Sequence, residues 1–414
     1  QENGDVQSLY KTELDKLVKV PVSPEAAAFM KYGDTKVSLY SGIPQVAIPL
    51  HTLEGREFNV PVSLTYDASG IKVEQLATWV GLGWNLNVGG RVTRVVNGLA
   101  DDYIQGDYAS ITTSANGITS PTVINNIINY RNNSSTFSSV VEMQEYFEFL
   151  HDISTNFVDA EPDYYSINAP GLNATVVRDI EDNSLLKALN NPRIKITQQS
   201  NGWVVTNEDG TIYEFLDKSE TTLKHGNDDI PNGAVTTEYE SSWLLTKITS
   251  ANGKDSFVFN YTDFGYWAQD QLGSSANRVV NEFQHHVFVY PEVTPQYGSG
   301  SGYWVKQQFL TSVAHNGITL MSTNLGTRHD IDDNGNNTRL SSLDFYDLEG
   351  NPLKSITFDN DNYFNLDGGD PSLKNRYDIR LKLDGITVRG RQNGIYQTYA
   401  FQYEDPDGLP ARTS

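Results

Sequence analysis

The first candidate for chemistry is a run of side-chain oxygens at Asp330-Ile331-Asp332-Asp333-Asn334-Gly335. Oxygen ligands stand at its first, third and fifth positions and glycine at its sixth, as in a calcium loop. The twelfth position of such a loop carries a bidentate glutamate, whereas this chain has Ser341 there. Asp, Asn and Gly also dominate turns. We therefore interpret the run as a hairpin tip that allows at most a weak surface cation, and we assign no metal or cofactor.

Other candidate ligands and nucleophiles are dispersed. The chain has seven histidines and no cysteine, and the adjacent pair is His285 and His286. Neighbours on a strand point to opposite faces, so this pair does not share a metal there. The glycine run at 298–302 has Gly300 where a G-x-S-x-G nucleophile elbow has serine. Neither feature supports a metal centre or serine-hydrolase chemistry.

Carboxylates and aromatic side chains remain as candidates for work on a sugar. Glu161/Asp163 and Asp101/Asp102 are the residue types that glycoside hydrolases pair. Chance pairs are expected among 52 acidic residues. Several aromatic residues could stack on sugar rings if exposed, although such side chains more commonly pack in a core. They are Tyr164, Tyr165, Tyr266, Trp267, Tyr303 and Trp304. The sequence therefore assigns no catalytic residue, and we expect a protein that is not an enzyme.

Charge and composition restrict the partners of the chain. It has 30 Lys+Arg against 52 Asp+Glu, a net charge of -22, so it repels phosphate backbones and a nucleic-acid partner is not expected. Hydrophobic residues make up 38% of the 414 residues, enough for a core. No apolar run is long enough for a transmembrane helix, and we expect none.

The strongest structural signature is the stretch 60–97, where β-type runs at 62–66, 71–73 and 92–96 alternate with turn glycines. Glycine supplies backbone angles that other residues resist, and indole rings supply buried area. The structural residues are Gly81, Gly83, Gly89, Gly90, Trp79 and Trp84. We interpret the stretch as strand, tight turn, strand: an architectural corner rather than a site of chemistry.

The chain around this corner is predicted to be mainly β. From 161 onward, strand signals recur around Gly-containing turns at 207–210, 251–254 and 348–351, with a last pair at 380–388 and 396–403. The run at 243–248 is the predicted strand before the second of these turns. This pattern predicts a long antiparallel meander. Because free sheet edges invite aggregation, we expect it to form a curled or closed β-shell or propeller-like body. The segment 263–303 is expected to be an exposed loop.

Four segments follow from these patterns. Residues 1–22 form an N-terminal leader, with a short amphipathic helix at 7–20, and 23–104 form a β-rich start with the Gly/Trp corner. Residues 105–160 are an Asn/Ser-rich helical insertion, and 161–414 are the hairpin body. A capping box at 139–142 begins a helix whose apolar stripe is expected to pack on the sheets. The stripe is Val140, Met143, Phe147 and Leu150. A substrate lid is the alternative interpretation of the insertion.

Several segments carry a family resemblance. They include SPEAAAFMKYGDTKVSLYSGIPQVAIPL, LTYDASGIKVEQLATWVGLGWNLNVGGRVTRVVNG, DAEPDYYSIN, TNEDGTIYEF, SSWLLTKITSANG and RLKLDGITVRG. Together they resemble the N-terminal region of Rhs/YD-repeat-related surface proteins, in the forms common in Bacteroidota-type bacteria. The block at 81–84, with Arg91 and Arg94, also resembles distantly the start of toxin-complex B subunits.

The resemblance implies a secreted, cell-surface protein exported by the type IX route, with a β-rich shell-like or propeller-like architecture and a scaffold or carrier role connected with adhesion or gliding motility. Its partners would belong to the cell envelope or the secretion machinery, or would be adhesins or toxins. Relatives of this kind continue beyond the point where Ser414 ends this chain, so we expect a fragment of a longer polypeptide. The alternative is a carbohydrate-binding or carbohydrate-active β-protein. Two carboxyl groups about 5–10 Å apart in an aromatic-lined groove would favour catalysis on sugars.

Overall fold

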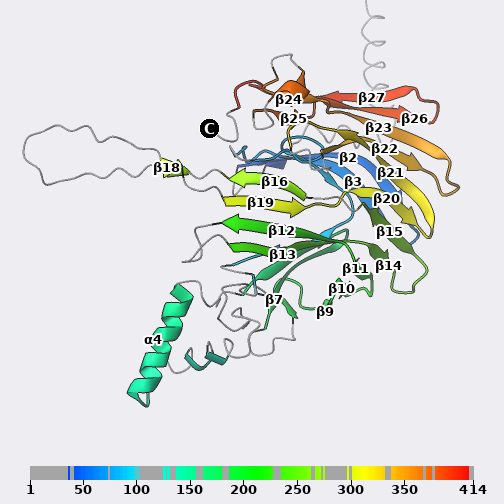
Figure 1. Cartoon of the computed structure of the whole chain (residues 1–414). Helices are drawn as coiled ribbons and strands as arrows, with labels where there is room; N and C mark the ends of the chain where they lie inside the picture. The colour runs from blue at the N-terminus through cyan, green and yellow to red at the C-terminus, as the bar shows by residue number, and fades with distance from the viewer. Residues whose placement is uncertain are drawn as a thin grey trace, which may run out of the picture.

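The computed structural model describes residues 36–37, 42–72, 75–97, 100–101, 125–126, 128–130, 137–154, 162–179, 186–226, 235–262, 266–271, 274–275, 296–297, 301–331, 337–366, 370–374 and 378–409. Over these residues the protein is mainly β, with antiparallel strands in sheets of four, eight and eleven strands (Figure 1). This confirms the mainly β, antiparallel part of the predicted fold class. The described strands form no closed barrel or propeller. The predicted leader lies outside the described residues.

The four-stranded sheet contains the first half of the predicted corner. Its order is β1 (Lys36–Val37), β2 (Pro44–Glu54), β3 (Asn59–Asp67) and β4 (Trp84–Asn87). Alternate residues of β3, including Val60, Val62 and Leu64, are fully buried, as expected of a strand with one face in a core. Pro49 lies in β2 at a register shift, where the missing N–H of proline is tolerated.

The eight-stranded sheet has the order β16-β19-β12-β13-β5-β6-β7-β8. In chain order its strands are β5 (Arg91–Val95), β6 (Tyr164–Ala169), β7 (Leu172–Arg178), β8 (Leu186–Ala188), β12 (Ser219–Gly226), β13 (Val235–Leu244), β16 (Tyr266–Gln271) and β19 (Ser301–Lys306). The prediction of a loop at 263–303 is therefore wrong in part, because β16 and the first half of β19 lie within it and the two strands pair with each other.

The eleven-stranded sheet is the predicted meander, with the order β27-β26-β23-β22-β21-β20-β15-β14-β11-β10-β9. Its strands are β9 (Lys195–Gln199), β10 (Gly202–Thr206), β11 (Ile212–Leu216), β14 (Lys247–Thr249), β15 (Ser256–Tyr261), β20 (Leu310–His315), β21 (Ile318–Thr327), β22 (Thr338–Tyr346), β23 (Pro352–Asp359), β26 (Gly385–Gly390) and β27 (Ile395–Ala400). At the predicted Asp-Gly turn, Gly210 has a φ of 85°, a value that glycine adopts readily.

Short links carry the chain between the two large sheets. They join β11 to β12, β13 to β14, β15 to β16 and β19 to β20. The run predicted as one strand at 243–248 is therefore wrong: it ends β13 in one sheet and begins β14 in the other. The run at 380–388 likewise divides into β25 (Arg380–Lys382), which pairs with β24 (Asn362–Phe364), and β26. The prediction of a strand at 71–73, the middle run of the corner, is also wrong, because Ile71 lies outside every described strand.

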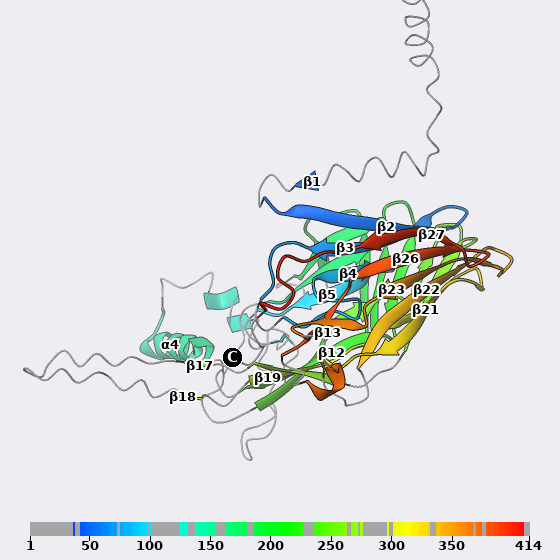
Figure 2. The ribbon, with the colours of Figure 1, turned by 90° about the horizontal axis from the view of Figure 1, so that it is seen from above.

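The larger of two hydrophobic cores among the described residues fills the space between the sheets. Trp203 of β10 lies 4.6 Å from Tyr165 of β6 and 5.5 Å from Trp243 of β13, measured between ring centroids. On the other side, Lys354 of β23 donates a hydrogen bond from Nζ to the carbonyl of Leu50 in β2 at 2.6 Å. Figures 1 and 2 show β2 and β3 beside the later strands of the eleven-stranded sheet. The eleven-stranded sheet therefore packs against both of the other sheets.

The predicted insertion contains α4 (Val140–Ser154), and its capping residue is as expected. The Oγ of Ser139 accepts a hydrogen bond from the N–H of Glu142 at 3.1 Å, while the Glu142 carboxylate accepts from the N–H of Ser138 at 2.7 Å. No described helix is long and apolar enough to cross a membrane.

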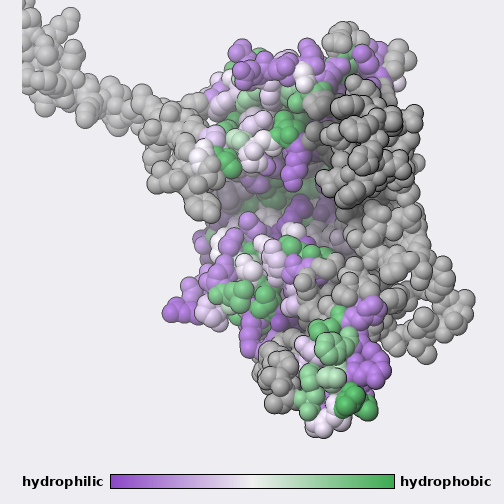
Figure 3. All heavy atoms as spheres, turned by 90° about the vertical axis from the view of Figure 1, so that its left-hand side faces the viewer, coloured by the Kyte–Doolittle hydropathy of each residue, from purple (hydrophilic) through white to green (hydrophobic). Residues whose placement is uncertain are grey.

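The expected packing of that helix is wrong. The stripe of Val140, Met143, Phe147 and Leu150 is 39–75% exposed, and Figure 3 shows hydrophobic side chains on the surface at the end of the molecule where α4 lies. The contacts come instead from an adjacent face, where the rings of Tyr146 and Phe149 lie 5.0 and 5.4 Å from that of Tyr130. Among the described residues, the helix therefore makes its aromatic contacts within the insertion.

Candidate functional site: a cleft between three sheets

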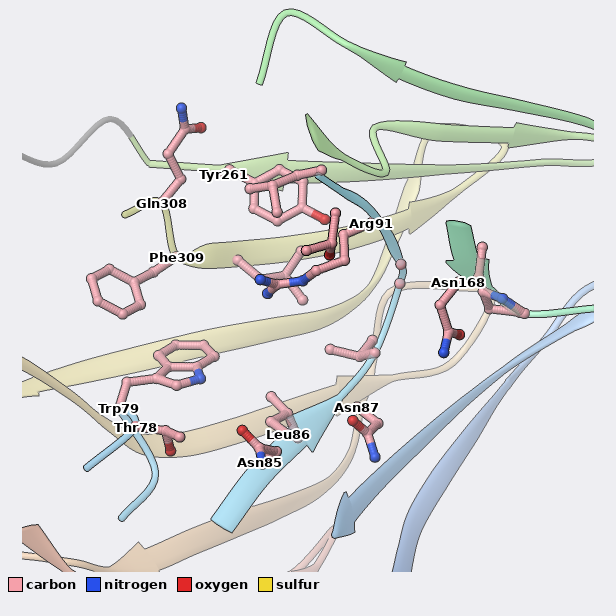
Figure 4. A pocket seen from close by; sticks show the side chains of 18 of the residues that line it. Thr78, Trp79, Asn85, Leu86, Asn87, Arg91, Asn168, Tyr261, Gln308 and Phe309 are labelled. Carbon is pink, nitrogen blue, oxygen red and sulfur yellow. The ribbon is translucent and has the colours of Figure 1, made fainter. Parts of the chain in front are cut away.

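A cleft of about 730 Å³ opens where the three sheets meet (Figure 4). Its walls come from β4 of the four-stranded sheet, from β5 and β6 of the eight-stranded sheet, and from the end of β15 and the start of β20. Clefts of about 300–1,000 Å³ are typical of small-molecule sites. The position at the junction of three sheets makes this cleft the candidate functional site.

One wall of the cleft is aromatic. Trp79 and Phe309 lie side by side, with ring centroids 5.2 Å apart and an interplanar angle of 35°. Tyr261 is held nearby because its hydroxyl donates to the carbonyl of Leu245 at 2.9 Å. Burial raises the pKa of Tyr261, so its hydroxyl stays protonated at neutral pH. The aromatic rings therefore present neutral, fixed surfaces to the cleft.

Side-chain amides occupy the other walls. Asn85 and Asn87 project from β4, and Asn168 projects from β6 (Figure 4). Asn87 donates a hydrogen bond to the hydroxyl of Thr65 at 2.9 Å. Each amide carries both a donor and an acceptor. Hydroxyl groups of Ser63, Thr93 and Ser166 also line the cleft.

Arg91 is the cationic residue of the lining. Its Nη1 lies 3.2 Å from Oε2 of Glu220, which is buried and also accepts a hydrogen bond from Ser242 at 2.7 Å. The Arg91 side chain is 51% exposed, whereas that of Glu220 is 8% exposed. The ion pair offsets much of the positive charge, and the guanidinium keeps further N–H donors that can face the cleft. The cleft is therefore polar but close to neutral.

The described lining lacks the side chains that most often act as general acids or bases. Among the described residues that line the cleft, none is Asp, Glu, His, Lys or Cys. General acid–base or nucleophilic catalysis needs such groups within reach of the reacting atoms. Nor do the described residues contain a group of three or more His, Cys, Asp or Glu able to hold a metal ion.

The predicted structural residues separate into two sets. Trp79, Gly89 and Gly90 line the cleft. Gly81, Gly83 and Trp84 are buried in the protein. A Cβ on Gly83 would come within 2.6 Å of the Tyr66 ring. Part of the predicted corner therefore lines the cleft.

Gly90 offers a sharp test of that corner. A Cβ on Gly90 would lie 2.4 Å from the carbonyl oxygen of Asn168, which no side-chain rotation can relieve. We expect Gly90→Ala to lower the free energy of unfolding by about 1–3 kcal/mol through overpacking, measured by urea unfolding. Gly390→Ala is the matched control, because nothing lies within 4 Å of its added Cβ. Equal losses in the two variants would contradict the close approach.

Two of the acidic candidates, Asp101 and Asp163, are brought together across the insertion. Asp163 Oδ2 lies 2.6 Å from Arg94 Nε and accepts the N–H of Asp101 at 3.1 Å. In return, Asp101 Oδ1 accepts the N–H of Asp163 at 3.0 Å. Both carboxylates are buried. They join the chain on either side of residues 102–161. Glu161 and Asp102 lie outside the described residues.

Two buried groups give opposite pH trends. Burial, and then the negative charge of Asp163, raises the pKa of Asp101 to about 6. The stability contributed by Asp101 is therefore present below its unfolded pKa, about 3.9, and is lost as pH rises through the folded value. Burial, and then the charge of Lys354, lowers the pKa of His51 to about 4. Stability from a neutral His51 is present above its unfolded pKa, about 6.5, and is lost as pH falls through the folded value.

Replacing Asp101 should separate these trends. We expect the urea midpoint of Asp101→Asn to rise more steeply with pH than that of the unmodified protein, over about pH 4 to 6.5, because the opposing trend of Asp101 is removed. Urea unfolding at constant ionic strength across this range measures the difference. Asp378→Asn, an exposed change, should keep the original profile. Parallel profiles for Asp101→Asn and the unmodified protein would contradict the assignment.

The remaining candidates are placed as follows. Asp330 is buried, its two oxygens each 2.7 Å from the Arg328 guanidinium, so the first ligand of a calcium loop is already neutralised. The segment joins the paired strands β21 and β22, which confirms the hairpin interpretation.

Tyr165 is a core residue, whereas Tyr164 is exposed. His285, His286 and Gly300, and the side chains of Tyr266, Trp267, Tyr303 and Trp304, lie outside the described part.

Sequence reasoning missed the cleft amides and a second buried pair. Asp255 accepts hydrogen bonds from the N–H groups of Arg56 and Glu57, both at 2.8 Å, and bonds to His315. Although burial opposes its ionisation, these partners hold the pKa of Asp255 below its usual range. It ties the β2–β3 turn to the eleven-stranded sheet. The sequence indicated this role of Asp255 only through its position beside the Asn252-Gly253 turn.

The fold and cleft define a mainly β, multi-sheet protein with a polar cleft. No family model, curated protein or solved structure matches this chain.

Proposed function

We propose that this chain is a non-enzymatic structural or carrier module of a secreted Rhs-type cell-surface protein, exported by the type IX route. Its partners would be components of the export machinery, adhesins or toxins. The composition of the cleft carries the non-enzymatic part of the proposal. An opening rich in amides, hydroxyls and aromatic rings, with no carboxylate, histidine or lysine among its described lining residues, suits binding better than turnover.

The edge of the eleven-stranded sheet supports a place within a longer shell. β27 has one neighbour among the described strands. Ile395 and Tyr396 on this strand are 63% and 72% exposed. A strand that ends a sheet with exposed large side chains invites pairing with another strand. We propose that a further strand of the same polypeptide adds here and extends the sheet into the curled β-shell.

Two measurements test the proposal. The chain is used as bait in an extract of its native cell envelope, and captured proteins are identified by mass spectrometry. Envelope or secretion proteins are the expected result, and capture of cytoplasmic proteins alone would refute the carrier role. The purified chain is also incubated with glycan substrates and the products analysed. Hydrolysis by the chain would refute the non-enzymatic assignment.

A further inference from the structure

We propose that the cleft binds a neutral carbohydrate chain. This inference stands apart from the carrier role, because it concerns the chemistry of the cleft rather than the partners of the whole module. It rests on three properties of the lining: an aromatic wall, amides on separate walls, and a cation that is already paired.

The aromatic wall supplies the apolar contact that a sugar ring needs. Trp79 is half-buried, packed on Phe309 at 5.2 Å, and lines the cleft. A sugar presents C–H groups on its ring faces, and a fixed indole buries them with little loss of side-chain entropy. Figure 4 shows both rings on the side of the cleft opposite Asn168.

The amides supply the polar contacts. Asn85 and Asn168 are exposed, and the side-chain amide of neither has a hydrogen-bond partner among the described residues. They come from different sheets, β4 and β6. A sugar hydroxyl both donates and accepts, and an amide offers both complements. A ligand with hydroxyl groups along its length can therefore bond to both walls at once.

Charge selects a neutral ligand over an anionic one. Arg91 is bound to Glu220 at 3.2 Å, and no lysine or histidine is among the described lining residues. The chain as a whole carries a net charge of -22, which repels anions approaching from solvent. Acidic sugars and phosphorylated ligands would lose more by desolvation here than the single, paired guanidinium returns.

The backbone of β4 disfavours an extended peptide in the same place. A peptide that adds to a sheet edge needs a row of free N–H and C=O groups. At the start of β4, the N–H of Trp84 donates to the carbonyl of Gly81 at 3.1 Å, and the carbonyl of Trp84 accepts from the Thr78 hydroxyl. The 78–81 turn therefore covers this part of the edge, which leaves side chains as the main source of recognition.

The test is binding of the purified chain to a panel of neutral oligosaccharides, acidic oligosaccharides and extended peptides, followed by calorimetry on the best ligand. We expect neutral oligosaccharides to bind. The double variant Asn85→Ala, Asn168→Ala should weaken that binding about tenfold or more, since each amide loses its hydrogen bonds. Asn260→Ala, Asn324→Ala is the matched control, because both residues are exposed asparagines on the eleven-stranded sheet. It should bind like the unmodified protein.

Several results would overturn the inference. These are absence of binding to every neutral oligosaccharide, tighter binding of acidic glycans or peptides, and unchanged affinity in the cleft variant. Thermal melts serve as the folding control. Both double variants should melt as cooperatively as the unmodified protein, because the changes are at exposed positions. A chain that binds no glycan yet still captures envelope proteins would refute this inference and leave the carrier proposal standing.

Discussion

Replacing Trp84 with alanine is expected to lower the free energy of unfolding by about 3–5 kcal/mol, the usual loss for truncating a buried tryptophan. Trp84 is 4% exposed, and its ring centroid lies 4.4 Å from that of Phe401 and 5.1 Å from that of Tyr66. Its indole N–H donates to the Tyr403 hydroxyl at 2.9 Å, which in turn donates to the carbonyl of Leu383 at 2.6 Å. Truncation would leave a cavity where β4 meets the end of the described chain and would remove the hydrogen-bond donor of the Tyr403 hydroxyl.

Urea unfolding followed by far-ultraviolet circular dichroism measures this loss without relying on the removed indole. Tyr403→Phe removes both hydrogen bonds of this hydroxyl and should cost about 1–3 kcal/mol. Tyr396→Ala removes an aromatic ring that is 72% exposed and should change stability by no more than about 0.5 kcal/mol. An unchanged melt in Trp84→Ala would show that the corner does not depend on this ring.

The second large effect is expected for Asp163→Asn, which should lower the free energy of unfolding by about 3–5 kcal/mol. Asp163 is fully buried beside Arg94, whose side chain is 2% exposed. Its two oxygens also accept the N–H groups of Asn97 at 3.0 Å and Asp101 at 3.1 Å. An amide has one acceptor oxygen and no charge, so the variant leaves a buried guanidinium without its carboxylate and one backbone donor without an acceptor.

Hydrogen exchange gives this prediction a local readout. Of the backbone amides of Asn97 and Asp101, the one that loses its acceptor in Asp163→Asn should exchange faster. Asp378→Asn is the same change at an exposed position, and it should leave both the stability and these two amides unaltered. If the two variants lose similar stability, the buried pair does not join the ends of the insertion.

The local elements of this fold were predictable because their signals are local. The alternation in β3, the Asp-Gly turn before β11 and the serine that caps α4 each depend on residues within a few positions of one another. The same locality explains the errors. Residues 243–248 have uninterrupted strand character, and nothing within them indicates that β13 and β14 belong to different sheets.

The helix illustrates a different limit. Its apolar stripe of Val140, Met143, Phe147 and Leu150 has the period of a packed helix face, yet it is exposed because Tyr146 and Phe149 make the contacts. Periodicity shows which side chains share a face of a helix. It does not show which of two neighbouring faces is covered.

The sequence by itself determined a mainly β chain, its hairpins and the Gly/Trp corner, because strand alternation and turn preferences depend on residues that are close together in the chain. Only the tertiary structure decided the cleft and the buried pairs. Asp101 and Asp163 are 62 residues apart, and Asp255 bonds to a turn 199 residues away. These partners meet only when the sheets pack against each other, so neither their spacing nor their residue types identify them in the sequence.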